Sequence, residues 1–180
     1  HGWLNEGMTS YVENRIVESL YGKEVSDMEY VISRNALREN IAGMPEATQA
    51  LAVKPGTELD ADDALSAVAY DKGAWFLQFL EQRFGRENFD AFLRGYFDHF
   101  AFQSVTTEQF LAYAKEHLFD KFPGTVTDAE IQEWIYAPGI PASAPQVMSR
   151  NFGIVDSARL AWLGSGQLPP RQITDAWSTQ

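Results

Sequence analysis

A glutamate near the start of this sequence is the first candidate for catalysis or metal binding. The stretch WLNEGMTSY, residues 3–11, places Glu6 directly after Asn5, and apolar residues return from Leu4 onward at helical spacing. One interpretation is local: Asn5 would cap a helix, and Glu6 would favour the positive end of its dipole. The alternative is that Glu6 binds a metal ion together with residues outside this chain. The other polar residues of the sequence are needed to choose between these two interpretations of Glu6.

Imidazole and thiol groups are scarce. The sequence has three histidines, His1, His99 and His117, and no cysteine. The histidines are too far apart to form a helical H-x-x-x-H pair, so no complete zinc site of that kind is encoded here. The lack of cysteine excludes disulfides, thiolate zinc sites and cysteine nucleophiles.

The composition is that of a globular, acidic protein. Of the 180 residues 45% are hydrophobic, which is enough for a sizeable core, and the formal net charge is -11 at pH 7. The 14 Lys and Arg residues are scattered, so nucleic acid and anionic membranes are poor candidate partners. No run of 18 or more apolar residues occurs, and no membrane-spanning segment is expected.

Helical periodicity dominates the first 100 residues. Ser26 and Glu29 have the spacing of a capping box, and Gly73, inside a helical run, predicts close packing or a local break. Aromatic residues after Asn88 repeat at helical spacing, which indicates a core-facing stripe. We expect helices over about residues 4–22, 26–43, 61–85 and 88–100, with a loop over 44–60.

Two further capping boxes precede apolar helical runs: Thr106 with Gln109, and Thr127 with Glu130. The predicted fold class is therefore all-α. Residues 136–145, YAPGIPASAP, are rich in proline, and helical character resumes after them. We expect a first domain over residues 1–136, a Pro-rich linker over 137–148 and the beginning of a second helical domain over 149–180.

Two motifs become informative together: WLNEG at residues 3–7 and YDKG at residues 70–73, followed by YAPGIP at 136–141. In combination they resemble the zinc aminopeptidases of the aminopeptidase N and leukotriene hydrolase family, the gluzincins. The likeness is colinear over about residues 2–145. It implies that residues 1–136 are the helical C-terminal part of a thermolysin-like catalytic domain, and that residues 149–180 begin a helical C-terminal domain.

The resemblance also implies a role for Glu6. In this family a catalytic zinc is bound by two histidines of an H-E-x-x-H helix and by a downstream glutamate, and Glu6 matches that glutamate. Only five residues precede Glu6, and His1 matches neither histidine. The two histidines and the general-base glutamate are thus expected outside this chain. Zn²⁺ is expected in the intact parent protein, and no cofactor is expected in this chain alone.

Tyr70 matches the family's catalytic tyrosine. Its phenol would donate a hydrogen bond to the oxyanion of the tetrahedral intermediate, a role that needs a preorganised donor rather than a base. On the residues alone, a buried tyrosine with a satisfied hydroxyl is an equally good interpretation of Tyr70. The resemblance favours the catalytic one.

Three further residues are weaker candidates for supporting the site or binding substrate. Glu13 lies two helical turns after Glu6 and either supports the site through hydrogen bonds or is a solvated surface residue. Asp62 falls near an acidic residue that reads the substrate's N-terminal side in relatives, although it also suits a helix N-cap. Asn5 belongs to the WLNEG motif. Leu65 stands where relatives with leukotriene hydrolase activity have an additional tyrosine, which argues against epoxide hydrolysis.

The resulting hypothesis is a segment of a zinc metalloaminopeptidase that removes N-terminal residues from peptides by attack of zinc-activated water. The segment alone is expected to be inactive. Its expected partners are peptide substrates in the parent, the remaining parts of the same polypeptide, and further copies of itself. The compartment stays open, with a soluble cytoplasmic protein favoured over a periplasmic one. The alternative is a non-catalytic helical module for protein interaction.

Overall fold

The computed structural model describes residues 2–52, 66–175 and 177. Within these residues all regular structure is helical and no strand occurs, so the predicted all-α fold class is confirmed. None of the described helices is both long and apolar enough to cross a membrane.

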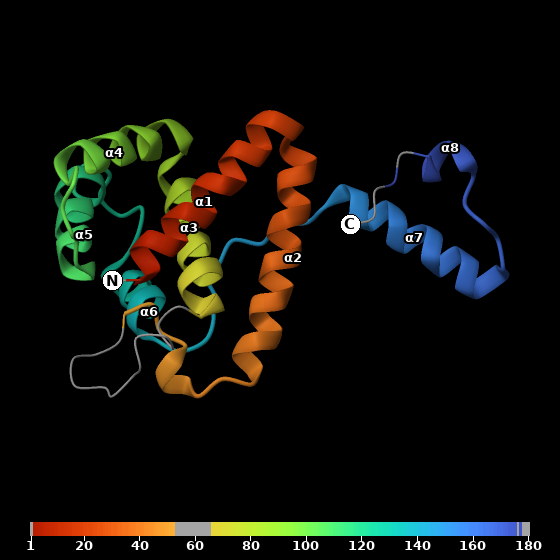
Figure 1. Cartoon of the computed structure of the whole chain (residues 1–180), viewed down its shortest axis with the longest axis horizontal. Helices are drawn as coiled ribbons and strands as arrows, with labels where there is room; N and C mark the ends of the chain where they lie inside the picture. Colours follow the sequence, from red (N-terminus) through yellow and green to blue (C-terminus); the bar gives the residue numbers. More distant parts are fainter. Residues whose placement is uncertain (1, 53–65, 176, 178–180) are drawn as a thin grey trace. The chain divides into compact units, whose positions relative to one another are not determined.

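The α-helices are labelled in Figure 1 in chain order. Two short segments are π-helical, η3 (Val68–Lys72) and η4 (Lys115–Phe119), and η1 (Glu46–Thr48) is a 3-10 helix. The α-helices are α1 (Gly2–Tyr21), α2 (Lys23–Ala42), α3 (Gly73–Phe84), α4 (Arg86–His99), α5 (Thr107–Ala114), α6 (Asp128–Tyr136), α7 (Arg150–Ser165) and α8 (Arg171–Thr174).

The chain packs as two units that divide α1 and α2 between them. The first unit contains His1–Glu13 and Arg34–Gln146, and the second contains Asn14–Ser33 and Val147–Gln180. The domain boundaries expected from the sequence, at residues 136 and 149, concern the organisation of the parent protein and stay a prediction.

Aromatic side chains form the core of the first unit. Trp134 of α6 lies against Trp75, Phe76 and Phe79 of α3, with ring centroids 5.5–6.3 Å apart. Such tilted and edge-on pairs add to the free energy gained from burying their large apolar area. Helix α3 is therefore held on several sides, which makes it a rigid support for the residues at its start.

The aromatic stripe of α4 is buried as predicted, apart from its end. Phe89, Phe92, Leu93 and Tyr96 are buried, whereas Phe97 is 50% exposed. The expectation that Phe97 belongs to the core is therefore wrong. A stripe at helical spacing is wider than the contact made by the neighbouring helices, so its edge residue stays in solvent.

Two of the three predicted capping boxes form. Thr106 and Gln109 cap α5, and Thr127 and Glu130 cap α6, each with both reciprocal hydrogen bonds. The third prediction, with Ser26 as the cap of α2, is wrong because α2 already begins at Lys23. Inside the helix, the Ser26 hydroxyl instead donates to the carbonyl of Asn14 at 3.3 Å.

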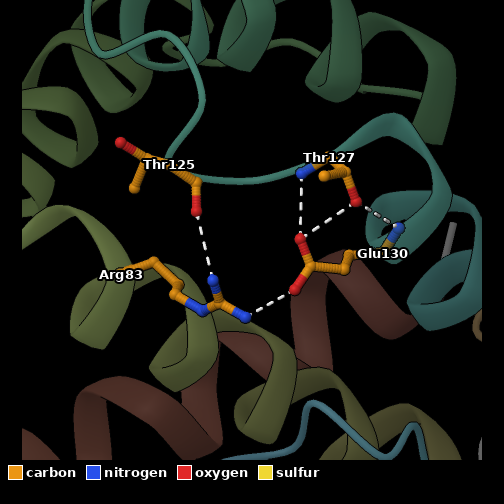
Figure 2. Close-up of polar contacts among 4 residues, drawn as sticks. All are labelled: Arg83, Thr125, Thr127 and Glu130. Atoms are coloured by element: carbon orange, nitrogen blue, oxygen red, sulfur yellow. Dashed lines mark hydrogen bonds and ion pairs between the residues drawn. The ribbon is translucent and has the colours of Figure 1, made fainter.

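The cap of α6 is also tied to α3 (Figure 2). The Arg83 guanidinium at the end of α3 donates to the Thr125 carbonyl at 3.2 Å and to the Glu130 carboxylate at 2.5 Å. Glu130 accepts at the same time from the Thr127 backbone N–H at 2.9 Å. One carboxylate therefore closes the capping box and binds the neighbouring helix.

The second unit exposes much of its apolar surface. Its longest helix beyond residue 33 is α7, which is capped by the Ser149 hydroxyl accepting from the Phe152 N–H at 3.2 Å. No residue of α7 is buried. Leu160, Trp162 and Leu163 are 53–64% exposed. Between α7 and α8 lies a pocket of about 610 Å³, with Ile154, Leu168 and Ile173 in its lining.

Candidate active site

Glu6 lies one turn into α1, and its side chain is half-buried. Asn5 is inside the same helix, which begins at Gly2, so the local interpretation of Asn5 as an N-cap is wrong. The Asn5 carbonyl accepts a hydrogen bond from the Thr9 hydroxyl at 2.9 Å, and its side chain is exposed. Since Glu6 does not follow a cap, the helix start no longer accounts for a carboxylate at this position.

Tyr70 lies on the π-helical segment η3, and its side chain is 38% exposed. A π-helical turn is wider than an α-helical turn and is a common feature of functional sites. In the described part of the helix expected over 61–85, this π-helical turn gives way to α3 at Gly73, where the sequence predicted close packing or a local break. The segment presents Tyr70 outward while its neighbours Val68, Ala69 and Lys72 are buried.

The structure brings Glu6 and Tyr70 together. A side-chain hydrogen bond to Glu6 is the largest cause of a raised pKa of Tyr70, and burial and the charge of Glu6 act in the same direction. The carboxylate next to the phenol therefore disfavours the loss of the phenol proton. A phenol and a carboxyl group are therefore side by side, although they come from distant parts of the sequence.

Two glycines set this juxtaposition. A Cβ atom on Gly7 would lie 2.7 Å from the Gly73 Cα, and one on Gly73 would lie 2.9 Å from the Gly7 Cα. Real Cβ atoms do not approach so closely, so the backbones of α1 and α3 meet only because both residues lack a side chain. Because Gly7 follows Glu6 and Gly73 ends the YDKG motif, this contact places the two motifs against each other.

Aromatic and polar anchors hold the first turns of α1 in place. The Trp3 indole N–H donates to the Thr107 hydroxyl at 3.0 Å, and its ring packs edge-on against Phe76 and Phe110. Further along, the Tyr11 hydroxyl donates to the Glu81 carboxylate at 2.5 Å. Residues on both sides of Glu6 are therefore fixed to the helices that carry and surround η3.

The two residues between Tyr70 and Gly73 are titratable and withdrawn from water. Burial raises the pKa of Asp71 to about 6. Burial also lowers the pKa of Lys72 to about 8, with a weaker opposing effect from Glu133. A role for Lys72 was not predicted from the sequence. The signal was available, because a lysine in the mostly apolar run VAYDKGAWFLQFL cannot keep its charge in water if the run is buried.

The weaker candidates lie apart from this pair or outside the described residues. Glu13 is exposed, further along α1. Asp62 and Leu65 fall in the segment 53–65, outside the described residues. Their predicted roles stay predictions.

A carboxyl group such as that of Glu6 can serve as one ligand of a zinc ion. Within residues 2–52, 66–175 and 177 no group of three or more His, Cys, Asp or Glu side chains could hold a metal ion. A half-buried carboxylate next to a phenol has the chemistry that a protein ligand of zinc would need.

Comparison with known proteins decides the family. The sequence profile described as the peptidase family M1 domain matches residues 1–134. This chain belongs to peptidase family M1. Leucine aminopeptidase 2 of Yarrowia lipolytica is 40% identical to it over 154 residues, which cover 78% of this chain and 23% of that protein. Aminopeptidase B of Rattus norvegicus is 32% identical over 180 residues, covering 97% of this chain and 28% of the relative.

A solved structure shows the same fold. The native leukotriene A4 hydrolase from Saccharomyces cerevisiae superposes with a TM-score of 0.82 at 29% identity, over 98% of this chain and 28% of that one. The resemblance found in the sequence is therefore confirmed. The chain spans about a quarter of the length of the M1 relatives it matches.

Proposed function

We propose that this chain is a segment of a zinc aminopeptidase that removes N-terminal residues from peptides. Membership of the M1 family and the similarity to proteins named as aminopeptidases support the hydrolase class. The observation that carries the proposal for this chain's own residues is that Glu6 and Tyr70 lie next to each other, where the backbones of Gly7 and Gly73 meet.

In this proposal Glu6 is the carboxylate ligand of the zinc. When bound, zinc would polarise the scissile carbonyl and lower the pKa of a coordinated water. Glu6 comes from a helix that is locked by the Gly7 and Gly73 contact, so its carboxylate is positioned before the metal is present. Such preorganisation reduces the entropy lost when a metal site forms.

Tyr70 supplies the hydrogen bond to the substrate oxygen that gains negative charge. The pKa of Tyr70 is raised above its ordinary value of 10.0, so the phenol carries its proton at neutral pH, as an unperturbed tyrosine also does, and acts as a donor rather than a base. A neutral donor aimed at developing charge stabilises the transition state more than the ground state. Its contact with Glu6 supports this role, since one substrate carbonyl could then reach both the metal and the phenol.

The 180-residue chain by itself is proposed to be inactive. It contains no H-E-x-x-H sequence, so two histidine ligands and a general-base glutamate would have to come from other parts of the parent polypeptide. Asn5, Glu13 and Asp62 stay candidates for supporting the site or contacting the substrate. With Leu65 at the position discussed above, aminopeptidase activity is proposed in preference to epoxide hydrolysis.

The test uses the full-length enzyme that contains this chain, with zinc content and peptidase activity measured together. Glu6→Gln is expected to lower both the zinc content and kcat/KM. Tyr70→Phe is expected to keep its zinc and lose about 10²- to 10³-fold in kcat, the usual cost of removing one oxyanion donor. Matched controls are Glu39→Gln and Tyr21→Phe, which change exposed residues of the same types on α2 and α1.

The competing proposal, a non-catalytic interaction module, makes the opposite prediction. Full zinc content and unchanged peptidase activity in both Glu6→Gln and Tyr70→Phe would overturn the enzyme assignment of these residues.

A further inference from the structure

Lys72 is completely buried, two residues after Tyr70 on the same π-helical segment. Its ammonium group donates to two backbone carbonyls, those of Gln49 and Ala137, at 2.9 Å each. Both acceptors are neutral and come from segments distant in sequence. Lys72 therefore joins the turn that carries Tyr70 to two other parts of the first unit.

The acceptors are themselves held in place by Gln49. Its buried side-chain amide donates to the carbonyls of Met44 at 2.8 Å and Ile41 at 3.2 Å, and its oxygen accepts from the Gly139 N–H at 2.9 Å. The Gln49 side chain thus links the end of α2 to the segment that contains Ala137. The Lys72 ammonium therefore binds two carbonyls, those of Gln49 and Ala137, whose segments are already connected by the Gln49 side chain.

This arrangement is costly for a purely structural contact. Removing an ammonium from water is expensive, and burial lowers the pKa of Lys72 to about 8. An apolar side chain of similar volume often stabilises a buried position as well as a charge does. An apolar residue, however, could not fix the direction of the turn through two hydrogen bonds.

We infer that Lys72 is a positioning residue, which fixes the π-helical turn through Gln49 and Ala137 so that the Tyr70 hydroxyl is aimed at the position beside Glu6. A displacement of about 1 Å at a catalytic group can cost about 10²-fold in rate. The single π-helical turn interrupts the regular α-helical hydrogen-bond pattern, and the two hydrogen bonds of Lys72 attach this turn to the rest of the unit. The inference rests on the proposed function of Tyr70.

A double-mutant cycle in the full-length enzyme tests it, with Lys72→Met, Tyr70→Phe and the double variant. Methionine keeps the length and apolar stem of lysine and removes the donors. We expect Lys72→Met to lower kcat about 10- to 100-fold, with KM changed less than about threefold. In the Tyr70→Phe background the same substitution should change kcat less than about threefold, because the group that it positions is gone.

Lys121→Met is the matched control, since Lys121 is an exposed lysine of the same unit. It should leave kcat and KM unchanged. If Lys72→Met prevents folding, as judged by circular dichroism, the cycle is repeated with Gln49→Met. This variant removes the side-chain hydrogen bonds of Gln49 and keeps the Lys72 ammonium. The same non-additivity with Tyr70→Phe is expected, with a smaller loss.

The outcomes separate this inference from the proposed function. If Tyr70→Phe itself has no effect on kcat, the proposed role of Tyr70 fails. If Tyr70→Phe lowers kcat, but Lys72→Met and Gln49→Met either leave kcat unchanged or reduce it equally in both backgrounds, Lys72 is only structural and the inference is overturned.

Discussion

The backbones of Gly7 and Gly73 touch, with room for no side chain between them: a Cβ on either residue would come within 2.9 Å of the other's Cα. One glycine directly follows Glu6 and the other lies three residues after Tyr70. The contact therefore determines how closely the carboxylate and the phenol approach each other.

Replacing Gly73 by alanine should destabilise the chain. The added Cβ would meet the Gly7 Cα at 2.9 Å and the Trp3 carbonyl oxygen at 3.2 Å, and backbone atoms cannot move aside cheaply. We expect a loss of about 1–3 kcal/mol in the free energy of unfolding, the usual cost of overpacking. Urea unfolding followed by tryptophan fluorescence measures it, since Trp3, Trp75 and Trp134 are buried.

The control for this change is Gly164→Ala on α7, where an added Cβ would meet nothing within 4 Å. This variant should be neutral or up to about 1 kcal/mol more stable, because alanine favours the helix. Equal effects of the two substitutions would contradict the close contact as the cause.

The isolated chain should bind no zinc with useful affinity. Glu6 supplies one carboxylate, and one ligand cannot replace the three protein ligands of a catalytic site. The measurement is elemental analysis of the purified chain after dialysis against a metal-free buffer. Stoichiometric zinc that survives dialysis would contradict the prediction and would point to ligands other than those proposed.

Asp71 should make the folded chain less stable as the pH rises from about 4 to about 6. Burial raises the pKa of Asp71 from 3.8 to about 6, so the folded chain holds this proton more tightly than the unfolded chain. This contribution to stability is complete below the unfolded pKa and is lost as the pH rises through the folded pKa. Solvent screening of the partly exposed carboxyl limits the effect to the order of 1 kcal/mol.

Urea unfolding at pH 4 and pH 7 measures this pH dependence in the wild-type chain and in Asp71→Asn. Asparagine cannot ionise, so the variant should lose less stability between the two pH values than the wild type. Glu39→Gln, which changes an exposed carboxylate, should follow the wild type. If wild type and Asp71→Asn change in parallel, the carboxyl of Asp71 is not withdrawn from water.

The ion pair between Arg83 and Glu130 should contribute measurably to stability, unlike most pairs at the surface. It joins α3 to the cap of α6 at 2.5 Å, and the guanidinium also donates to the Thr125 carbonyl. We expect Arg83→Met to cost about 0.5–1.5 kcal/mol, as for one net hydrogen-bonded contact. Thermal unfolding is the measurement.

Arg159→Met is the comparison for that pair. Arg159 and Asp156 form an ion pair within α7 in which both side chains are more than half exposed. Such pairs contribute about 0–1 kcal/mol to the free energy of unfolding. We therefore expect the loss of stability in Arg159→Met to lie at the low end of this range. A larger loss for Arg159→Met than for Arg83→Met would show that the link from α3 to α6 is unimportant.

The isolated chain should self-associate through α7. Leu160, Trp162 and Leu163 are all more than half exposed on this helix, and apolar surface of this kind favours association in water. Light scattering over a range of concentrations should show a mass that rises with concentration. Leu160→Lys with Leu163→Lys should reduce the rise, and a strictly monomeric wild-type chain would refute the prediction.

The sequence by itself determined the features that depend on a few neighbouring residues. The capping boxes at Thr106 and Thr127 form as predicted because cap and partner lie three residues apart within one turn. The buried stripe beginning at Phe89 follows from the helical period alone. The motifs around Glu6 and Tyr70 also sufficed to recognise the family, which the comparison with known proteins confirms.

Only the tertiary structure decided which distant groups meet. No local pattern could indicate that Gly7 packs on Gly73, or that the buried ammonium of Lys72 binds the carbonyls of Gln49 and Ala137. Local rules also failed at Ser26, where the helix begins earlier and the hydroxyl binds the Asn14 carbonyl. Packing free energy summed over many residues outweighs the roughly 1 kcal/mol of a single cap, so these contacts follow from the assembled fold.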